Sequence, residues 1–580
     1  MDGMEKKQKQ QQLKEEAMEM EEDQYQGWKS MPYVIGNETF EKLGTIGTTA
    51  NLLVYLTTVY HLPSARAATL VNFFSGTTNL APLVSAFLSD TFFGRFPTIA
   101  AASLSSFLGM LLLTLTAALP SLHPQPCRTS SSASSCHGPS RWQMAALLSS
   151  FAFLVAGAGG IRPCNLAFGA DQFDPRTDSG RRGIASFFNW YYFTFTVSMM
   201  ISATLIIYLQ SNVSWAIGLA VPAALMALSC ALFFIGTRLY VRVKPEGSPF
   251  TSFAQVFVAA VRNRHRSSAS PLFDPPHRSK LVAKIAYTDQ FRCLDKAAAM
   301  VVEPDTSSSP NPNRSRNPWR LCSVQQVEEV KCLVRMTPVW SAGIVYFIVL
   351  THLGTYVVFQ AMQTDRRLGQ HFQIPPGSMV VFNMLALTVW IPLYDRLIVP
   401  ALTRITRRDG GITQLQRIGV GLVLSVAAVS VAAAVEHRRR RLAAGDGIIM
   451  SCFWLVPQQV LAGMSEAFAM IGQTEFYYKQ FPENMRSVAG ALFFLAFAVA
   501  SYASGFMVAA VHRTTGWLAQ DLDHGRLDLF YLLVAAIAAA NVGYFFVCAR
   551  WYRFKKTTNS IDMDDVELQG SSNGAVGSKV

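Results

Sequence analysis

The stretch MPYVIGNETFEKLG, residues 31–44, opens an apolar segment that continues to Tyr60 without another charged side chain. Glu38, Glu41 and Lys42 are spaced so that a helix carries all three on one face, where Glu38 can pair with Lys42. Ionisable groups inside a membrane segment are costly to bury and commonly belong to a proton or ion relay. The alternative is a helix end whose charged side chains reach the lipid headgroups. We favour the relay.

The composition is that of a membrane protein. Of 580 residues, 51% are hydrophobic and 15% are charged, which fits many spans joined by charged loops. The net charge of +13 is attributed to membrane topology and to contact with the lipid surface, so no nucleic-acid partner is expected. The sequence has no nucleophile-and-base arrangement and no metal-ligand cluster. We therefore expect no enzyme activity, no metal and no cofactor other than coupling protons.

Stretches long enough to cross a bilayer, about 20 residues each, recur along the chain. They predict an all-α membrane protein with twelve transmembrane helices. The predicted spans are 39–60, 67–89, 97–119, 143–163, 186–209, 214–236, 338–360, 379–401, 416–435, 448–474, 487–511 and 528–549.

The spans form two sets of six, separated by a basic insert that is broken by Pro and Ser. The predicted parts are an N-terminal tail (1–30), a six-helix bundle (31–237), a middle loop (238–335), a second six-helix bundle (336–554) and a C-terminal tail (555–580). The middle loop ends in Ser323-Val324-Gln325-Gln326, which has the spacing of a capping box and predicts a helix. That helix lies either against the membrane surface or against the transmembrane helices.

Lys and Arg in the short loops predict the orientation of the spans. Basic residues follow spans four, eight, ten and twelve, and all of them are cytoplasmic if both termini and the middle loop are cytoplasmic. The run Arg438-Arg439-Arg440-Arg441 after span nine contradicts this arrangement, which puts it outside. The other loops outweigh it, so we expect a multi-pass protein with cytoplasmic termini.

Nine cysteines do not form a disulfide scaffold, since most lie in spans or in the middle loop. Cys127 and Cys136 share an external loop, where oxidation is possible. A disulfide between them and two free thiols both remain open.

The two halves carry a similar pattern at the end of their second helix. Span two ends in Ser89-Asp90-Thr91-Phe92-Phe93-Gly94-Arg95, and span eight ends in Tyr394-Asp395-Arg396. Two six-helix halves with such a repeat are typical of major facilitator transporters, in which the substrate lies between the halves. We expect Asp90, Gly94 and Arg95 to act in the conformational change.

Two more charges lie in opposite halves. Arg162 ends span four, and Glu475 lies in span ten, nine residues after Glu466. A buried Arg opposite a buried Glu would be strongly coupled, because desolvated partners cannot be separated cheaply. Protonation of Glu475 would then release Arg162, and we infer a proton-operated latch between the halves.

Several motifs in this order carry a resemblance to a known family. They are Glu38-Thr39-Phe40-Glu41-Lys42, Asp90-Thr91-Phe92-Phe93-Gly94-Arg95, Phe168-Gly169-Ala170-Asp171-Gln172-Phe173-Asp174, Phe187-Phe188-Asn189-Trp190-Tyr191-Tyr192-Phe193 and Tyr287-Thr288-Asp289-Gln290-Phe291-Arg292-Cys293-Leu294-Asp295-Lys296. From Met31 to Phe554 the chain resembles the plant nitrate and peptide transporter family, within the proton-dependent oligopeptide transporters of the major facilitator superfamily.

The resemblance implies roles for the charged residues. The ExxE(R/K) motif of the first helix carries proton coupling, which transfers to Glu38, Glu41 and Lys42. The interdomain pair of helices four and ten transfers to Arg162 and Glu475. Here Arg replaces the Lys of many relatives, which keeps the charge but makes deprotonation implausible.

Substrate recognition departs from the family pattern. Leu350 stands where the best understood nitrate carrier of the family has a nitrate-binding histidine, and His352 is rotated from it by about 200° on an ideal helix. The residues after the helix-five aromatics, Phe193 to Ser198, also differ from the usual small, polar sequence. His352, Leu350 and Glu466 are our candidates for the substrate pocket.

The resemblance, closest to the branch of nitrate and glucosinolate carriers, implies proton-driven nitrate symport of low affinity across a plant cell membrane. We expect alternating access and, for location, the plasma membrane rather than the tonoplast. The expected partners are nitrate or another small anion, protons and the lipid bilayer, with a homodimer possible. The alternatives are a larger organic anion, such as a glucosinolate or a hormone, then di- or tripeptides, and a membrane sensor that does not transport.

Overall fold

The computed structural model describes residues 25–125, 138–174, 177–242, 249–265, 271–275, 285–300, 319–369, 372–406, 412–445, 449–480, 486–519 and 522–554. Cys127 and Cys136 of the predicted external loop lie outside these ranges. The described chain is almost entirely helical, with one two-stranded antiparallel ribbon.

The elements follow in three groups along the chain. The N-terminal group is η1 (Gly27–Lys29), α2 (Met31–Thr49), α3 (Leu52–Thr58), α4 (Ser64–Leu88), η2 (Ser89–Phe93), α5 (Arg95–Ala118), α6 (Arg141–Ala170), α7 (Asp178–Ile201), η3 (Ser202–Ile206), η4 (Leu209–Val213), α8 (Trp215–Ile235) and η5 (Gly236–Arg238). The middle loop contains α9 (Pro249–Arg262) and α10 (Arg292–Asp295). The C-terminal group is α11 (Val324–Met362), β1 (Arg367–Leu368), β2 (Phe372–Gln373), η6 (Pro376–Met379), α12 (Val380–Leu393), η7 (Tyr394–Ile398), α13 (Val399–Thr406), α14 (Gln414–Gly445), η8 (Cys452–Leu455), α15 (Val456–Gln480), α16 (Arg486–Thr514) and α17 (Leu527–Trp551).

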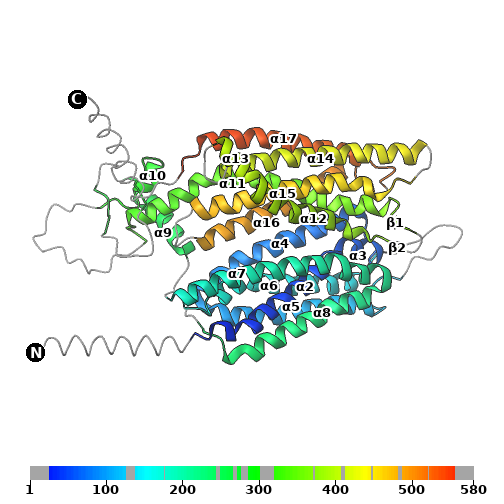
Figure 1. Ribbon diagram of the computed structural model, residues 1–580, viewed down its shortest axis with the longest axis horizontal. Coiled ribbons are helices and arrows are strands. Elements are labelled where there is room, and N and C mark those ends of the chain that lie inside the picture. Colours follow the sequence, from blue (N-terminus) through cyan, green and yellow to red (C-terminus); the bar gives the residue numbers. More distant parts are fainter. Residues whose placement is uncertain are drawn as a thin grey trace, which may run out of the picture.

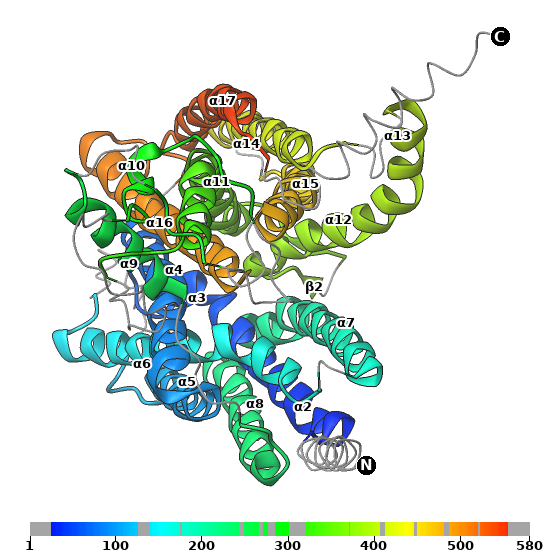
Figure 2. The same cartoon turned by 90° about the vertical axis from the view of Figure 1, so that its left-hand side faces the viewer.

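The helices form two bundles that lie side by side (Figures 1 and 2). In the N-terminal bundle α5 packs on α6 and α2 on α8, while in the C-terminal bundle α14 packs on α15 and α17. The middle-loop helices α9 and α10 lie at one end of the molecule, and the ribbon β1–β2 lies at the other (Figure 1). The prediction of an all-α, two-bundle fold is confirmed.

Each predicted span overlaps a helix, but the helices differ in how apolar they are. Seven of the described helices are long and apolar enough to qualify alone as membrane spans. The other predicted spans fall on α2 with α3, α4, α7, α12 and α15. Of these, α2, α7 and α15 carry acidic and basic side chains, and α12 has only 14 residues before η7 continues it. These three helices therefore carry charged side chains into otherwise apolar bundles, and such charges commonly mark functional sites in membrane proteins.

The long helix α11 begins where the capping box predicts. The Ser323 backbone N–H donates to Gln326 Oε1 at 3.0 Å, and the Gln326 N–H donates to Ser323 Oγ at 3.3 Å. The helix then continues through Pro338 to Met362, so the predicted domain boundary at residue 335 falls inside one helix. Its first turns pack on α9 and α10 through Val327 and Val330.

The middle-loop motif is held on α11 by buried charges. Lys331 Nζ lies 2.7 Å from Asp295 Oδ1 and 2.8 Å from Glu328 Oε1. The Tyr287 hydroxyl donates to Asp295 at 3.0 Å, while the Thr288 hydroxyl donates to Glu328 at 2.8 Å. Partial burial, with the hydrogen bond to Asp295, raises the pKa of Tyr287 to about 12. The motif thus serves as a strut between the middle loop and α11.

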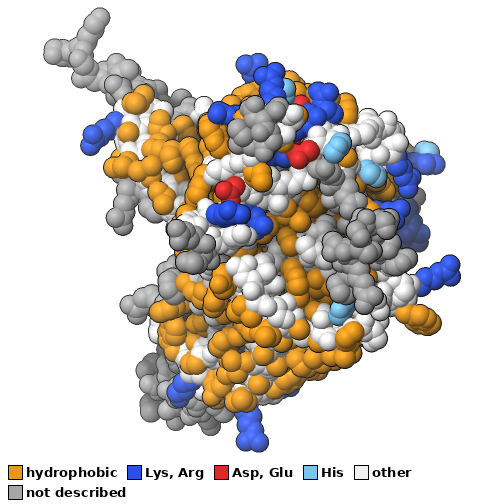
Figure 3. Space-filling model, turned by 90° about the vertical axis from the view of Figure 1, so that its right-hand side faces the viewer, with side chains coloured by type: hydrophobic (Ala, Val, Ile, Leu, Met, Phe, Trp, Pro, Cys, Tyr) orange, Lys and Arg blue, Asp and Glu red, His pale blue; other side chains and the backbone are white. Residues whose placement is uncertain are grey.

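The two bundles touch where α4 packs on α16 and beside the β1–β2 ribbon. Thr77 of α4 and Tyr502 of α16 share a hydrogen bond of 2.8 Å, and Ser378 Oγ donates to the Ala203 carbonyl at 2.9 Å. The rings of Tyr208 and Phe372 stack with centroids 6.0 Å apart. Phe372 belongs to the ribbon and Ser378 follows it, so two of these three contacts lie at the end of the molecule that Figure 3 views.

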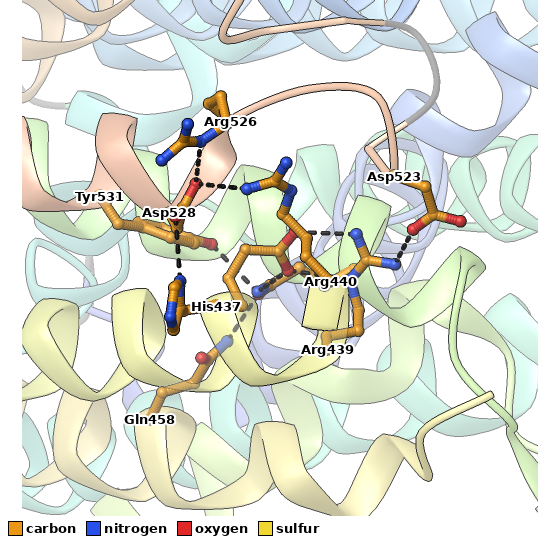
Figure 4. Close-up of polar contacts among 10 residues, drawn as sticks. His437, Arg439, Arg440, Gln458, Asp523, Arg526, Asp528 and Tyr531 are labelled. Atoms are coloured by element: carbon orange, nitrogen blue, oxygen red, sulfur yellow. Dashed lines mark hydrogen bonds and ion pairs between the residues drawn. The ribbon is translucent and has the colours of Figure 1, made fainter. Parts of the chain in front are cut away.

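The run Arg438 to Arg441, which contradicts the predicted topology, belongs to α14, because that helix continues ten residues beyond the predicted end at 435. Three of these arginines have partners within the C-terminal bundle. Arg439 binds Glu436 through Nε at 3.0 Å and NH2 at 2.8 Å, and its NH1 binds Asp523 at 2.6 Å (Figure 4). Arg440 NH1 lies 3.1 Å from Asp528, and Arg438 covers the ring of Trp454 at 4.0 Å. Acidic side chains therefore neutralise much of the positive charge of this arginine run, which the prediction from sequence treats as unpaired.

Glu436 is fully buried and ties four helices together. It accepts a hydrogen bond of 2.9 Å from Gln360 of α11. The Gln360 side-chain oxygen in turn accepts from Gln458 of α15 at 3.0 Å and from Tyr531 of α17 at 3.2 Å (Figure 4). This network fixes the β1–β2 end of the C-terminal bundle.

Arg439→Ala should destabilise the protein strongly. It leaves Glu436 buried with no cationic partner among the described residues, and breaking a buried ion pair costs about 3–5 kcal/mol. We expect a clear fall in Tm of the detergent-solubilised protein. Arg441→Ala is the control, since its side chain is exposed, and should unfold near the wild-type Tm. Equal Tm values for the two variants would contradict a stabilising role for the network.

Candidate proton and substrate site

The three charges of α2 form one buried cluster. Lys42 Nζ lies 3.2 Å from Glu38 Oε1 and 2.9 Å from Glu41 Oε2. All three side chains are almost fully buried, and the Thr45 hydroxyl donates to Glu41 at 2.7 Å. The three side chains thus point into protein, and the alternative of charges that reach the headgroups does not fit this burial.

Two residues of neighbouring helices orient Glu38, and one of them, Tyr191, belongs to a family motif. Asn165 of α6 donates to Glu38 Oε2 at 2.5 Å, and the Tyr191 hydroxyl of α7 also hydrogen-bonds Glu38. Close packing of α2 supports this arrangement, since a Cβ at Gly44 would lie 3.0 Å from the Pro222 carbonyl. The cluster is therefore held by three helices of one bundle.

Arg162 belongs to the same region of the N-terminal bundle. Its NH1 donates to Asn79 Oδ1 of α4 at 2.8 Å, and it lies close enough to Glu41 for their charges to interact. Glu38 and Glu41 then supply two negative charges, and Lys42 and Arg162 supply two positive ones. With both acids ionised, the group is electrically neutral.

The structure places Glu475 with other partners than Arg162. Glu475 Oε2 lies 3.5 Å from Arg417 NH1, and its Oε1 accepts from Gln414 at 3.3 Å. Both partners belong to α14, within the C-terminal bundle. In this conformation the described contacts of Arg162 stay in one bundle and the residues paired with Glu475 lie in the other. The latch between Arg162 and Glu475 remains a prediction.

A cavity of about 350 Å³ lies between the bundles. Ile46, one turn after Lys42 and about 6 Å along the helix axis, lines it. Leu350 and Glu466, two of the three predicted pocket residues, also lie on its wall. The other described lining residues are Thr49, Ala50, Ser75, Met199, Ala203, Leu353, Gly354, Val357, Val358, Gly377, Val380, Asn383, Met384, Gln459 and Ala462. Much of the wall is apolar.

His352 differs from its predicted place. It is fully buried and does not line the cavity, and its ring packs edge-on against Phe530 with centroids 5.1 Å apart. The physical reason is the helix geometry: residues 350 and 352 point in nearly opposite directions, so one faces the cavity and the other faces α17. Neither ring nitrogen has a hydrogen-bond partner in the described structure.

The polar part of the cavity wall consists mainly of amides beside Glu466. Asn383 of α12 donates to Glu466 Oε1 at 2.7 Å. Asn383 Oδ1 and Gln459 Nε2 are buried without a hydrogen-bond partner in the described structure. Sequence reasoning missed these amides, as well as Asn79 and Asn165, because it considered only ionisable residues. The sequence feature that could have identified these amides is a polar side chain inside an apolar span.

The motif after span two makes a tight connection. η2 is a π-helical turn, and Gly94 follows it with φ 80°, a left-handed conformation that favours glycine. Arg95 then begins α5 and forms an ion pair with Asp171, one of the two acids of another family motif. Burial raises the pKa of Asp171, and Arg95 opposes this shift. The side chain of Asp90 lies outside the described part of the structure.

Comparisons with known proteins agree with this architecture. The model of the POT family matches residues 96–523. "Protein NRT1/ PTR FAMILY 2.11" of Arabidopsis thaliana is 52% identical over 573 residues, covering 95% of this chain and 92% of that relative. "Protein NRT1/ PTR FAMILY 2.9" of the same plant is 49% identical over 566 residues, covering 94% and 96%.

Solved structures show the same fold at low sequence identity. The crystal structure of an auto inhibited POT family peptide transporter superposes with a TM-score of 0.66 at 19% identity, covering 91% of this chain and 98% of that one. The POT family transporter PepTSo gives a TM-score of 0.65 at 18% identity, covering 90% and 98%. This chain therefore belongs to the POT family of membrane transporters, in its plant NRT1/PTR branch, and is a transporter rather than an enzyme.

Proposed function

We propose that this protein is a proton-driven symporter of an organic anion that works by alternating access. The observation that carries the proposal is the neutral charge cluster of Glu38, Glu41, Lys42 and Arg162 beside the cavity. A proton on Glu41 weakens its hold on Lys42 and leaves the cluster with one net positive charge. That charge attracts an anion, so proton and anion travel together.

The cavity supports an organic substrate rather than a bare inorganic anion. Its volume of about 350 Å³ lies within the range of about 300–1,000 Å³ that is usual for drug-sized ligands. Leu350, Leu353, Val357 and Met199 offer apolar contacts, and the wall around Gln459 offers hydrogen bonds. A glucosinolate or a hormone has both kinds of surface.

Nitrate is the second candidate. It is supported by two basic side chains that could hold a small anion. Lys42 lies one helical turn before the cavity residue Ile46, and Arg162 interacts with Glu41. A bare anion in a dry cavity is heavily penalised unless donors or cations surround it. The cavity wall supplies few donors, and Leu350 stands where the family resemblance predicts a ligand histidine.

The proposed location is the plasma membrane with both termini cytoplasmic. The basic loops support this orientation. The pairing of Arg438, Arg439 and Arg440 removes the strongest objection, because acidic and aromatic partners hold them within the C-terminal bundle.

Glu41→Gln should abolish accumulation driven by external acid. Glutamine can still accept the hydrogen bond from Thr45, but it cannot release a proton. The measurement is substrate uptake by oocytes at acid and neutral pH, with surface labelling to verify that the variant reaches the membrane. Exchange of substrate across proteoliposomes, which needs no net proton movement, should survive. Uptake with the pH dependence of the wild type would rule out coupling through Glu41.

Two double-mutant cycles distinguish the predicted latch of Arg162 with Glu475 from the observed pair of Arg417 with Glu475. Arg417 and Glu475 pair in this conformation, but the Glu475 side chain is 36% exposed, so their coupling in stability should be only about 0.2–1 kcal/mol. Arg162→Ala and Glu475→Ala should each impair transport, and the double variant should lose less than the sum, because an unpaired buried charge is worse than none. Strictly additive transport losses would mean that Arg162 and Glu475 never pair.

Offering several substrates in turn tests the choice of substrate. Oocytes that express the chain should give inward currents at acid pH with a glucosinolate or a hormone anion, because the cavity offers apolar contacts. Excess nitrate should not compete. Dipeptides serve as the comparison for peptide transport. Nitrate currents without any response to organic anions would overturn the organic-anion proposal in favour of nitrate.

A further inference from the structure

Glu466 occupies an unusual position on the cavity wall. It is the one ionisable side chain among the described residues that line the cavity, and it comes from α15 of the C-terminal bundle. The proton cluster of the proposed function lies on the opposite bundle, in α2. Glu466 therefore places a carboxylate where an anionic substrate must lie.

No described basic side chain lies within ion-pair distance of Glu466. Its described polar contact is the Asn383 amide, which donates to Oε1 at 2.7 Å. The unpartnered atoms Asn383 Oδ1 and Gln459 Nε2 lie on the same part of the wall. An ionised carboxylate without a cation is costly in a low-dielectric cavity, and a neutral, protonated one is not.

The neighbouring helices offer no compensating charge. From α11 the titratable group is Tyr346, whose hydroxyl accepts from Ser465 at 3.3 Å and lies within electrostatic range of Glu466. From α14 it is Arg417, which is paired with Glu475 at 3.5 Å. α12 has no titratable side chain and contributes only the uncharged Asn383.

The groups across the cavity and on α16 are also engaged. Glu41 and Lys42 of α2 pair with each other at 2.9 Å. Tyr502 of α16 shares its hydrogen bond with Thr77 of α4. An incoming anion therefore meets the charge of Glu466 with no cation on the described cavity wall to offset it.

We propose that Glu466 is a second proton-binding carboxylate, which must be protonated before an organic monoanion can occupy the cavity. This inference rests on the proposed function and deepens it. The carboxylate takes up a proton on the side where substrate enters, becomes a neutral hydrogen-bond donor beside Asn383, and releases the proton where the anion leaves. With one proton on the α2 cluster and one on Glu466, each monoanion is carried with one net positive charge.

The affinity for the anion should therefore depend on pH. Only the protonated fraction binds the anion, so the apparent Kd rises about tenfold per pH unit once Glu466 is ionised. Glu466→Gln imitates the protonated form permanently. When Glu41 is also replaced by Gln, so that the α2 cluster no longer takes up a proton, this variant should bind the anion equally well at acid and neutral pH.

The experiment is anion exchange in proteoliposomes between pH 5.5 and 7.5, using the organic anion that the wild type carries in oocytes. It is performed in the wild type, in Glu41→Gln and in the double variant Glu41→Gln/Glu466→Gln. Glu41→Gln should still lose exchange as the pH rises, and the double variant should not. In oocytes, Glu466→Gln alone should carry one fewer charge per substrate molecule than the wild type.

Two further variants guard against a merely structural effect. Asn383→Leu removes the donor that favours the ionised carboxylate, so its exchange should persist to higher pH than in the wild type. Asp289→Asn removes an acid whose side chain is 78% exposed in the middle loop, and it should keep the wild-type profile.

The outcomes separate this inference from the proposed function. An unchanged pH profile and an unchanged charge per substrate in Glu466→Gln would overturn the role of Glu466 alone. So would loss of exchange in a Glu466→Gln protein that reaches the membrane and unfolds near the wild-type Tm. A wild type that carries no anion at any pH would overturn the proposed function, and this inference with it.

Discussion

The cost of burying charge between apolar helices is the constraint on which this structure depends. Two unit charges 4 Å apart interact by about 4 kcal/mol at an effective dielectric constant of 20, so a buried ion seeks a partner or loses its charge. Three groups of charged side chains meet this demand, each within its own bundle. The α2 cluster lies in the N-terminal bundle, and the C-terminal bundle contains the pair of Arg417 with Glu475 and the network around Glu436. Each half can then move as a unit without separating the ions of these groups.

In the proposed mechanism, the neutrality of these groups links proton binding to movement. A protein that alternates between two conformations must break and remake the contacts between its halves. The contacts described here are hydrogen bonds and ring contacts between α4 and α16 and beside the β1–β2 ribbon. These contacts are individually weak compared with a buried ion pair. A single proton that changes the charge of one half is therefore large enough to alter the balance between conformations.

The sequence predicts the fold and the ionisable residues well, because charges inside apolar spans are conspicuous. Glu38, Glu41 and Lys42 lie together as their helical spacing requires. The partners could not be predicted, because Asn165, Asn383 and Arg417 belong to other helices, and pairing across a bundle leaves no local pattern. The run at Arg438 counts against the predicted topology only while its partners are unknown, because the acids Asp523 and Asp528 come from a distant part of the chain.

The chemistry and position of each ionisable side chain limit which groups can carry protons. Arg162 remains charged, since a guanidinium does not deprotonate in proteins, so the Arg that replaces the family's Lys cannot act as a proton carrier. His352 faces α17, away from the cavity, and is therefore removed from the transport path. Protons must then travel on carboxylates. The carboxylates that face the cavity or the charge cluster beside it lie on both bundles, so in the mechanism proposed above proton binding would act on both walls of the cavity.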